Sequence, residues 1–286
     1  MKPSCAALLL LCGCRFANRS VEAPAQRLVS LSKQYSEIIY ALGAQQDLVA
    51  VDLSSTYPPQ IKSLPTVGYH RALTAEGILS VRPTLVLHDD NVGPEQVLQQ
   101  LRQLKVPLKV FQNKGVDIAS TGRLIAEMGA FFHQEARAKE LVAKLDADMA
   151  RALAARPGKR PRVLLIHYGR AMNVYLAMTR SSTAGQMIEW AGGEVAVEGE
   201  RGMVQLSPEI VAQSDPDVLL LTDFGYDRLG APQEIAGALP GVASTRAART
   251  GRIHRVEEHD LVYIGPRTGE NVLKLRELLH GGDAAR

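Results

Sequence analysis

Short apolar runs alternate with amphipathic stretches along residues 27–116. Each run has the length of a strand and is apolar at most positions, which is typical of parallel strands buried on both faces. The stretches between the runs have helical spacing, and several begin or end at a hydroxyl residue, a proline or a glycine. We predict strands at 27–31, 47–52, 84–89 and 107–111, and helices at 34–42, 74–80 and 94–104.

The pattern changes between residues 117 and 157, where no run of strand type occurs. From Glu135 to Ala155 this segment would form one helix about 30 Å long, at 1.5 Å per residue, ending before Pro157. Its length and its position predict a strut that joins two lobes. Apolar residues recur there at every fourth position, with charged residues between them: Leu141, Leu145, Met149 and Leu153.

A second α/β segment follows this helix. Residues 162–168 are an apolar run, residues 184–191 have helical spacing, and residues 194–198 form the next apolar run. The predicted fold class is therefore α/β, with two lobes of mainly parallel sheets joined by one long α-helix. We place the export signal at 1–23, the N-terminal lobe at 24–116, the linking helix at 117–157 and the C-terminal lobe at 158–286.

One motif occurs in both halves of the chain. In 74–87, and again in 207–220, a hydroxyl residue stands two positions before a glutamate. A proline follows that glutamate by seven positions, and an apolar run follows the proline. The hydroxyl would cap a helix, and the glutamate would lie near the positive end of the helix dipole. The shared spacing predicts two related lobes, with Glu76 and Glu209 at equivalent places.

The first residues have the order of an export signal. Lys2 gives a basic start, and the apolar run from Ala6 to Gly13 is too short to span a bilayer. The small residues before Cys14 resemble a bacterial lipoprotein processing site, which would make Cys14 the lipidated residue. Plain cleavage near residues 23–25 is the alternative.

Composition narrows the class of protein. All three cysteines lie in the export segment, so the mature chain would contain no internal disulfide and no thiolate metal site. The formal net charge is +3 and no element concentrates Lys and Arg, which argues against a nucleic-acid partner. The sequence has no G-x-S-x-G elbow, no phosphate-binding glycine loop and no H-E-x-x-H motif. We therefore predict a binding protein and not an enzyme.

Two α/β lobes, one linking helix and an export signal resemble the periplasmic solute-binding proteins of ABC importers for iron chelates, cobalamin and haem. The resemblance covers about residues 27–279. Within that group the stretch STYPPQIKSLPTVGYHRALTAEGILSVRP, residues 55–83, is similar to the haem-binding members, and Ile264-Gly-Pro-Arg267 fits them too. The resemblance implies a periplasmic protein that captures haem with a small hinge motion and passes it to an importer.

The resemblance places the axial ligand of the haem iron at Tyr69. An anionic oxygen favours Fe³⁺, and a bound metal removes the proton of a weak acid. Gly68 permits a sharp turn that projects the side chain, and Arg71 would pair with a propionate through its planar guanidinium. From the residue types alone, a Tyr69 packed under the loop would be the better interpretation. We expect His70 at the rim, because neighbours in an extended loop point apart.

Candidates from the second lobe follow the carboxyl ends of strands, where ligands bind in open α/β sheets. A structural histidine and solvated loop residues are the alternative interpretation of these positions. The candidates are His167 and Tyr168 as a second iron ligand, Arg170 and Arg228 as propionate partners, and Tyr226 as a residue of the cleft.

The implied cargo is haem b, carried as a transported ligand. A ferric siderophore or a corrinoid is the close rival, because either would use arginines and aromatic residues in the same cleft. A Zn²⁺ or Mn²⁺ site is the weaker rival. His88, Asp89 and Asp90 close a strand, but the remaining histidines have no matching spacing.

The resemblance also implies partners. Glu76 and Glu209 would dock on arginines of the importer permease in the inner membrane, although charges in the first turn of a helix explain the residue type equally well. An outer-membrane haem receptor would act upstream. We expect a monomer in the periplasm, tethered to a membrane if Cys14 carries lipid.

Overall fold

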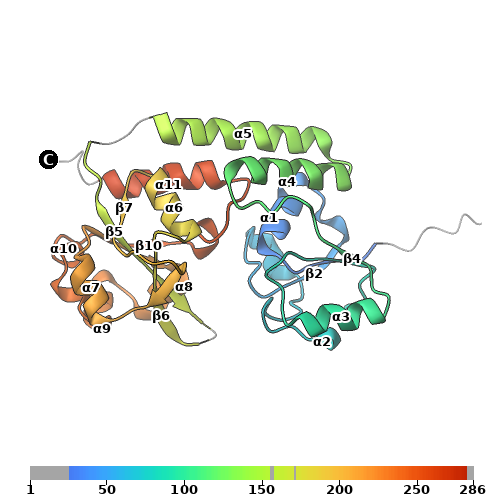
Figure 1. Cartoon of the computed structure of the whole chain (residues 1–286), viewed down its shortest axis with the longest axis horizontal. Coiled ribbons are helices and arrows are strands. Elements are labelled where there is room, and N and C mark those ends of the chain that lie inside the picture. Colours follow the sequence, from blue (N-terminus) through green and yellow to red (C-terminus); the bar gives the residue numbers. More distant parts are fainter. Residues whose placement is uncertain (1–25, 155–157, 171, 282–286) are drawn as a thin grey trace, which may run out of the picture.

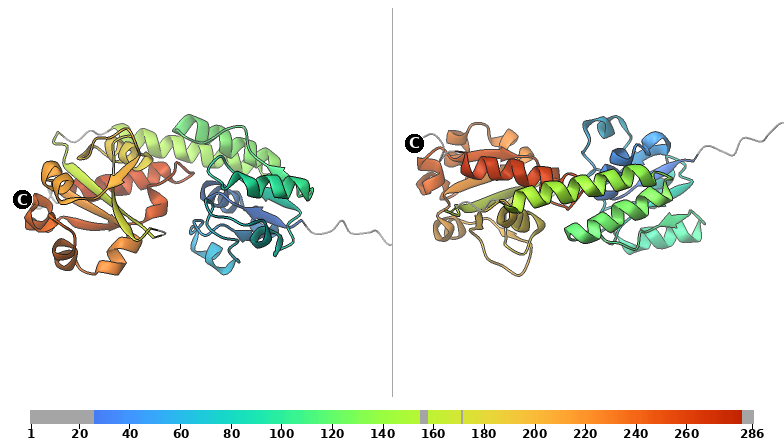
Figure 2. Two further views of the ribbon diagram at one scale, coloured as in Figure 1. Left: turned by 60° about the horizontal axis from the view of Figure 1, so that its bottom comes forward. Right: turned by 90° about the horizontal axis from the view of Figure 1, so that it is seen from above.

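The computed structural model describes residues 26–154, 158–170 and 172–281. The predicted export signal and Cys14 lie outside these residues. Figure 1 shows two lobes side by side, with helix α5 (Glu135–Ala154) running across both of them. Figure 2 shows the same bridge from two further directions. The prediction of two α/β lobes joined by one long helix is confirmed.

The first lobe is built on a fully parallel sheet of four strands in the order β2-β1-β3-β4. Every strand lies inside its predicted run and is shorter than that run. Ser32 caps the first helix by accepting a hydrogen bond from the backbone N–H of Tyr35, and Gly43 ends the helix with a φ of 74°. The elements are β1 (Leu28–Ser30), α1 (Lys33–Leu42), η1 (Gln45–Asp47), β2 (Leu48–Val51), η2 (Pro59–Ser63), α2 (Ala75–Leu79), β3 (Leu85–Leu87), α3 (Glu95–Gln103), β4 (Leu108–Lys109) and α4 (Ile118–Phe131).

The second lobe has a mixed sheet of six strands in the order β10-β9-β5-β6-β8, with β7 also paired to β5. The hairpin of β5 and β6 was not predicted. Strand β5 continues beyond its parallel partner β9. After β5 the chain turns back, and β6 pairs with the end of β5 in antiparallel orientation. The elements are β5 (Arg162–Gly169), β6 (Val174–Met178), α6 (Thr183–Trp190), β7 (Glu194–Val195), β8 (Met203–Gln205), α7 (Pro208–Ser214), β9 (Val218–Thr222), α8 (Asp223–Leu229), α9 (Pro232–Ala238), η3 (Val242–Ser244), α10 (Arg246–Arg249), β10 (Ile253–Val256), η4 (Glu258–Asp260) and α11 (Thr268–His280).

Helix α5 packs against α4 and against α11. Glycines permit both close approaches: a Cβ added to Gly129 would lie 2.4 Å from the Cβ of Ala138, and one added to Gly269 would lie 2.5 Å from the Cβ of Asp148. Leu145 of α5 belongs to a buried cluster that contains side chains of both lobes. Because this core continues through α5, a large rotation of one lobe against the other would disrupt close packing.

The repeated motif has the same local structure in both lobes. Thr74 Oγ1 and Ser207 Oγ each accept the backbone N–H three residues ahead, at 3.0 and 3.3 Å, and so begin α2 and α7. Glu76 and Glu209 are the second residues of these helices, and both are exposed. The residues before the two prolines share a positive φ, 48° at Arg82 and 27° at Asp215.

No helix within the described residues is both long enough and apolar enough to cross a bilayer.

Candidate functional site

The loop that carries Tyr69 lies beside the carboxyl end of β2, where Val51 forms a bridge with Thr66. Gly68 has a φ of 118°, a conformation that favours glycine. The backbone N–H of Ala72 donates to the carbonyl of Tyr69 at 2.7 Å and closes a turn. Tyr69 is 36 % exposed, which is unusual for a large aromatic side chain in this protein. The turn therefore presents the phenol at the surface.

His70 corrects one expectation from the sequence. It does not lie at the rim, because the backbone turns here and the rings of Tyr69 and His70 meet edge to face, with centroids 4.4 Å apart. The side chain of His70 is 12 % exposed, and its Nδ1 lies 3.4 Å from Oδ2 of the fully buried Asp52. The ring of His70 thus packs against the ring of Tyr69 on one side and contacts Asp52 on the other.

The carboxylate of Asp52, which contacts His70, is itself held by hydrogen bonds. Its Oδ2 accepts a hydrogen bond from the backbone N–H of Ser54 at 2.8 Å, and its Oδ1 accepts one from the hydroxyl of Ser55 at 2.6 Å. Burial alone would raise the pKa of Asp52, but the bonds from His70, Ser54 and Ser55 outweigh it and hold this pKa below its usual value. The carboxylate is therefore ionised at neutral pH, and it fixes the position of His70.

Two cations of the first lobe lie close to this loop. Arg71 is exposed, and its guanidinium forms no hydrogen bond or ion pair with the residues that the structure describes. Lys33 is the first residue of α1, and its Nζ lies 5.9 Å from the ring centroid of Tyr263 in the second lobe. Burial lowers the pKa of Lys33, while Glu258 and Asp52 raise it.

His167 faces this region from the second lobe. Its side chain is 16 % exposed, and its Nδ1 lies 3.7 Å from Oε2 of Glu258. Burial lowers the pKa of His167, Glu258 opposes this effect, and the charge of Lys33 adds to it. The imidazole is therefore neutral at pH 7, which is the form that binds a metal. We call Lys33, Asp52, Tyr69, His70 and Arg71, with His167 and Glu258 opposite them, the ligand face.

Tyr168 points to the other face of β5, because side chains alternate along a strand. It is 7 % exposed, its hydroxyl donates to Oδ1 of Asn173 at 2.5 Å, and its ring lies 5.0 Å from that of Tyr175. The structure thus places His167, and not Tyr168, with the ligand face.

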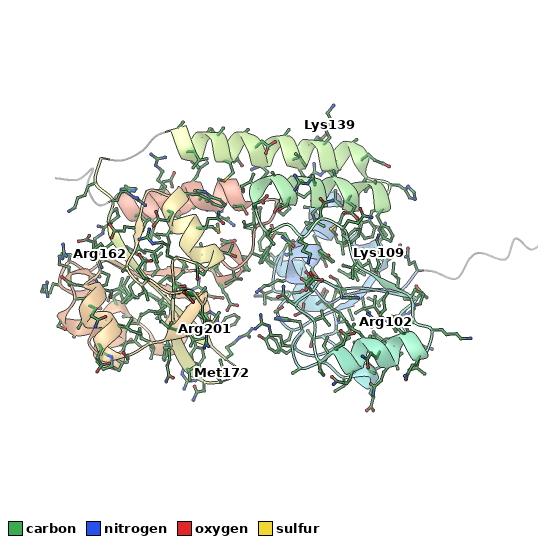
Figure 3. The ribbon with its side chains drawn as sticks, in the orientation of Figure 1. Arg102, Lys109, Lys139, Arg162, Met172 and Arg201 are labelled. Atoms are coloured by element: carbon green, nitrogen blue, oxygen red, sulfur yellow. The ribbon has the colours of Figure 1, made fainter. Side chains whose placement is uncertain are left out.

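The other candidates of the second lobe lie near the β5–β6 hairpin. The guanidinium of Arg170 stacks on Phe224 at 3.8 Å, and that of Arg228 lies 5.3 Å from the ring of Tyr168. Tyr226 lies on helix α8, and not in a loop, and it packs against the core of its lobe. Figure 3 shows Met172 at the tip of the hairpin, on the side that faces the first lobe. Met172 is 67 % exposed.

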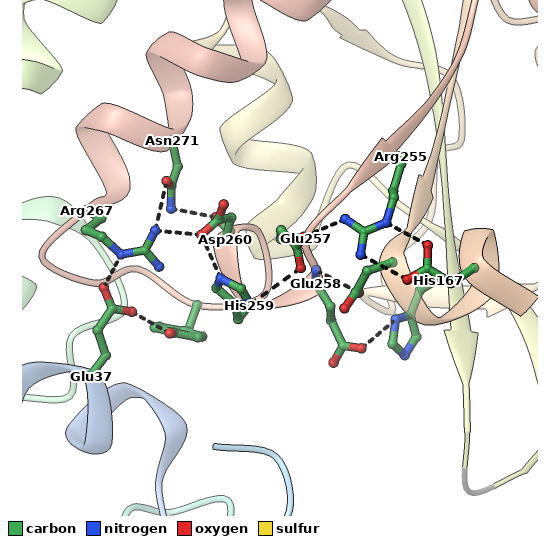
Figure 4. Close-up of polar contacts among 12 residues, drawn as sticks. Glu37, His167, Arg255, Glu257, Glu258, His259, Asp260, Arg267 and Asn271 are labelled. Atoms are coloured by element: carbon green, nitrogen blue, oxygen red, sulfur yellow. Dashed lines mark hydrogen bonds and ion pairs between the residues drawn. The ribbon is translucent and has the colours of Figure 1, made fainter. Parts of the chain in front are cut away.

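A second group of residues joins the lobes closer to α5. Figure 4 shows Glu37 of α1 reaching Arg267 at the start of α11. Arg267 Nε donates to Glu37 Oε1 at 2.9 Å, and Arg267 Nη1 donates to Asp260 Oδ1 at 2.8 Å. The hydroxyl of Tyr263 donates to the other oxygen of Glu37. Side chains of both lobes therefore share one buried network.

Tyr57 completes this network. Its ring lies 3.6 Å below the guanidinium of Arg267 and stacks on His259, with centroids 4.8 Å apart. We call Glu37, Tyr57, His259, Asp260, Tyr263 and Arg267 the hinge cluster. A cavity of about 600 Å³ lies beside it, between both lobes and α5, and none of the predicted haem residues lines this cavity. Tyr57 of the stretch 55–83 and Arg267 of the stretch 264–267 thus touch each other, so the two stretches that resemble haem-binding proteins meet here.

His88, Asp89 and Asp90, the alternative Zn²⁺ or Mn²⁺ site, do not come together as metal ligands. Nδ1 of His88 lies 3.2 Å from the carbonyl of Asp89, and Asp90 pairs with Lys114. Among the residues that the structure describes, no three His, Cys, Asp or Glu side chains converge on a common point as metal ligands would. Nothing here favours a Zn²⁺ or Mn²⁺ site.

A family model of periplasmic binding proteins matches residues 28–258. The chain belongs to the periplasmic binding protein family. Its structure is similar to that of the periplasmic heme-binding protein RhuT from Roseiflexus sp. RS-1 in apo form. The TM-score is 0.81 at 37 % identity, over 92 % of this chain and 100 % of the other. It is also similar to the periplasmic heme-binding protein BhuT in complex with two hemes, with a TM-score of 0.79 at 30 % identity, over 90 % of this chain and 98 % of the other.

Among curated proteins, the vitamin B12-binding protein of Pectobacterium carotovorum subsp. carotovorum (strain PC1) is 23 % identical over 229 residues, which are 80 % of this chain and 78 % of the relative. The family and these neighbours consist of solute-binding proteins, so the role of a periplasmic binding protein is supported for the chain as a whole.

Sequence reasoning missed three residues of the ligand face of this periplasmic binding protein: Lys33, Asp52 and Glu258. A usable signal existed for two of them, because Asp52 closes an apolar run and Lys33 follows one by two residues. His167 was selected because ligands bind beyond the carboxyl ends of strands. The same rule selects Lys33 and Asp52. Glu258 follows β10, a strand that the pattern did not reveal.

Proposed function

We propose that this protein binds haem between its lobes and delivers it to an ABC importer. The observation that carries the proposal is an exposed tyrosine on a turn that starts with glycine, supported by His70 and Asp52. A phenolate oxygen is a ligand that favours Fe³⁺. Arg71 and Lys33 are cations that suit the two propionates of haem b. The neighbouring structures named as periplasmic heme-binding proteins support the same cargo.

A corrinoid is the second candidate, because curated relatives are named vitamin B12-binding proteins. The corrin ring carries amide side chains in place of carboxylates, so it would leave the cations of the ligand face without a counter-charge. A ferric siderophore has the same weakness unless it carries free carboxylates. Haem therefore fits the charges and the exposed phenol better.

The test is a titration of the purified protein with hemin, followed by absorption spectroscopy. We expect a ferric tyrosinate spectrum, which Tyr69→Phe abolishes while affinity falls by about tenfold or more. Tyr226→Phe is the matched control, since this tyrosine packs against the core of its lobe. A spectrum unchanged in Tyr69→Phe would remove Tyr69 from the site. Thermal stabilisation by cyanocobalamin and none by hemin would favour the corrinoid.

We propose His167 as the second axial ligand of the haem iron, because its imidazole is neutral and it lies opposite Lys33 of the first lobe. Wild-type protein loaded with hemin should then be six-coordinate. His167→Ala should keep the tyrosinate band and become five-coordinate and high-spin, as read by electron paramagnetic resonance. An identical spin state in both proteins would remove His167 from the iron.

Docking is assigned to Glu76 and Glu209. Both are exposed at equivalent helix starts, so each lobe presents one carboxylate to a permease. In vesicles that contain the importer, Glu76→Lys or Glu209→Lys should reduce the stimulation of ATPase activity and leave hemin binding intact. Glu140→Lys, on the exposed side of α5, is the control. Full stimulation by both lobe variants would argue against this surface.

Residues 1–23 would direct export, with lipid on Cys14. Mass spectrometry of the mature N-terminus after expression in a bacterium tests both points. A mature chain that starts near residue 26 without lipid would leave export intact and remove the anchor.

A further inference from the structure

Lys33 is an unusual lysine in this protein. It directly follows Ser32, the cap of α1, at the carboxyl edge of the first sheet, and it is only partly exposed. Within the described ranges 26–154, 158–170 and 172–281, its ammonium forms no hydrogen bond and no ion pair. The Nζ of Lys33 lies 5.9 Å from the centroid of the Tyr263 ring, in the other lobe. A cation removed from water normally has a partner, so the Lys33 ammonium is suited to pair with an anionic ligand.

The charges around Lys33 do not supply that partner. Three carboxylates attract it from different elements, and Arg71 repels it. Each carboxylate is bound elsewhere: Asp52 by Ser54 and Ser55, Asp89 by the backbone of Asn91, and Glu258 beside His167. None of these carboxylates is within hydrogen-bond or ion-pair distance of the Lys33 ammonium, so its N–H donors are free for an anionic group between the lobes, where the ligand face of the proposed function lies.

We propose that Lys33 forms an ion pair with a carboxylate of the cargo, and thereby selects a porphyrin that carries acidic side chains over a ring that carries amides. This inference rests on the proposed haem function. Part of the cost of removing Lys33 from water is already met in the empty protein, so the pair forms with less loss than one made by a free surface lysine. Arg71, which is exposed, holds the second carboxylate nearer to solvent.

The two arginines of the second lobe are less suited to this role. Arg170 and Arg228 already lie on aromatic rings, and Arg228 also contacts Tyr175. A propionate would have to compete with these contacts. The ammonium of Lys33 lies farther from its nearest ring, at 5.9 Å from the centroid of Tyr263, and this ring belongs to the other lobe.

The experiment compares hemin with its dimethyl ester, which keeps the iron and the ring but has no carboxylates. Both are titrated, in the same dilute detergent, into wild type, Lys33→Met, Lys33→Arg and the surface control Arg102→Gln. We expect Lys33→Met to weaken hemin binding by about tenfold, since a charge-assisted pair is lost, and to leave ester binding unchanged. Lys33→Arg should retain most of the hemin affinity, and the tyrosinate band should remain in every variant.

The outcomes separate the two proposals. Equal losses for hemin and ester in Lys33→Met, or no loss for either, would overturn the ion pair and leave haem binding standing. A wild type that gives no hemin complex would overturn the proposed function and, with it, this inference. Thermal melting of each variant without ligand shows that a loss of affinity does not come from unfolding, and Lys33→Gln serves as a second neutral variant.

Discussion

The hinge cluster and the ligand face both place charges between the lobes, but they treat those charges in opposite ways. In the hinge cluster, Glu37 and Arg267 are buried, paired with each other and bonded to further side chains. In the ligand face, Lys33 and Arg71 have no such partner among the described residues. Buried charges that are satisfied hold one geometry, whereas charges left unpaired favour a ligand. The same kinds of residue are therefore paired across the lobes in the hinge cluster and left without an ion pair in the ligand face.

The largest expected effect is in the hinge cluster. Arg267→Met leaves Glu37, which is 3 % exposed, as a buried carboxylate without its cation. We expect the free energy of unfolding to fall by about 3 kcal/mol or more in urea titrations. Arg255→Met is the matched control, because its partners Asp227 and Glu257 lie on the surface, and it should cost about 1 kcal/mol or less. Equal losses in the two variants would break the comparison.

The next effect tests the support behind Tyr69. Asp52→Asn weakens the hydrogen bonds from Ser54 and Ser55 and removes the charge beside His70, and we expect a loss of about 2 kcal/mol at pH 7. The folded pKa of Asp52 lies below its usual value of 3.8. Its stabilising effect is therefore present above that value and is lost as the pH falls through the folded pKa.

The gap between wild type and Asp52→Asn should accordingly narrow only as the pH falls below 3.8, which urea titrations between pH 7 and pH 2 would measure. A gap that stays constant with pH would mean that the charge of Asp52 contributes nothing to stability. Asp146→Asn, at a position of α5 outside the ligand face, controls for general effects of removing a carboxylate.

The smallest effect has the opposite sign. Lys33→Met removes a cation that burial disfavours, so we expect stability without ligand to be unchanged or to rise by about 1 kcal/mol. The folded pKa of Lys33 lies below its usual value of 10.5. The cost of the charge therefore falls as the pH rises above the folded pKa, and it vanishes as the pH approaches the usual value.

Any advantage of Lys33→Met should thus be larger at pH 7 than at pH 10, as followed by urea titration at both values. A clear loss of stability at pH 7 would place Lys33 with the hinge cluster, as a structural charge. It would then contradict the division between the two regions.

Much of the fold follows from local patterns. The runs at 27–31 and 162–168, the cap at Ser32 and the start of α5 at Glu135 were all readable, because periodicity and capping depend on neighbours in the chain. The β5–β6 hairpin was not predicted, because it depends on β5 extending past the end of its parallel partner β9, and the sequence pattern does not show where β9 ends relative to β5. The position of His70 was wrong for a similar reason: Gly68 turns the backbone, and the distant Asp52 captures the imidazole.

By itself, the sequence determined the class of fold, the two related halves and the tyrosine that a glycine presents, because each is encoded within a short window. Tertiary structure alone decided which charges meet. Tyr57 and Arg267 are far apart in the chain and stack on each other, and Lys33 lies near Tyr263 of the second lobe without an ion pair among the described residues. Ion pairing depends on distance in space and on burial, and neither can be read from spacing along the chain.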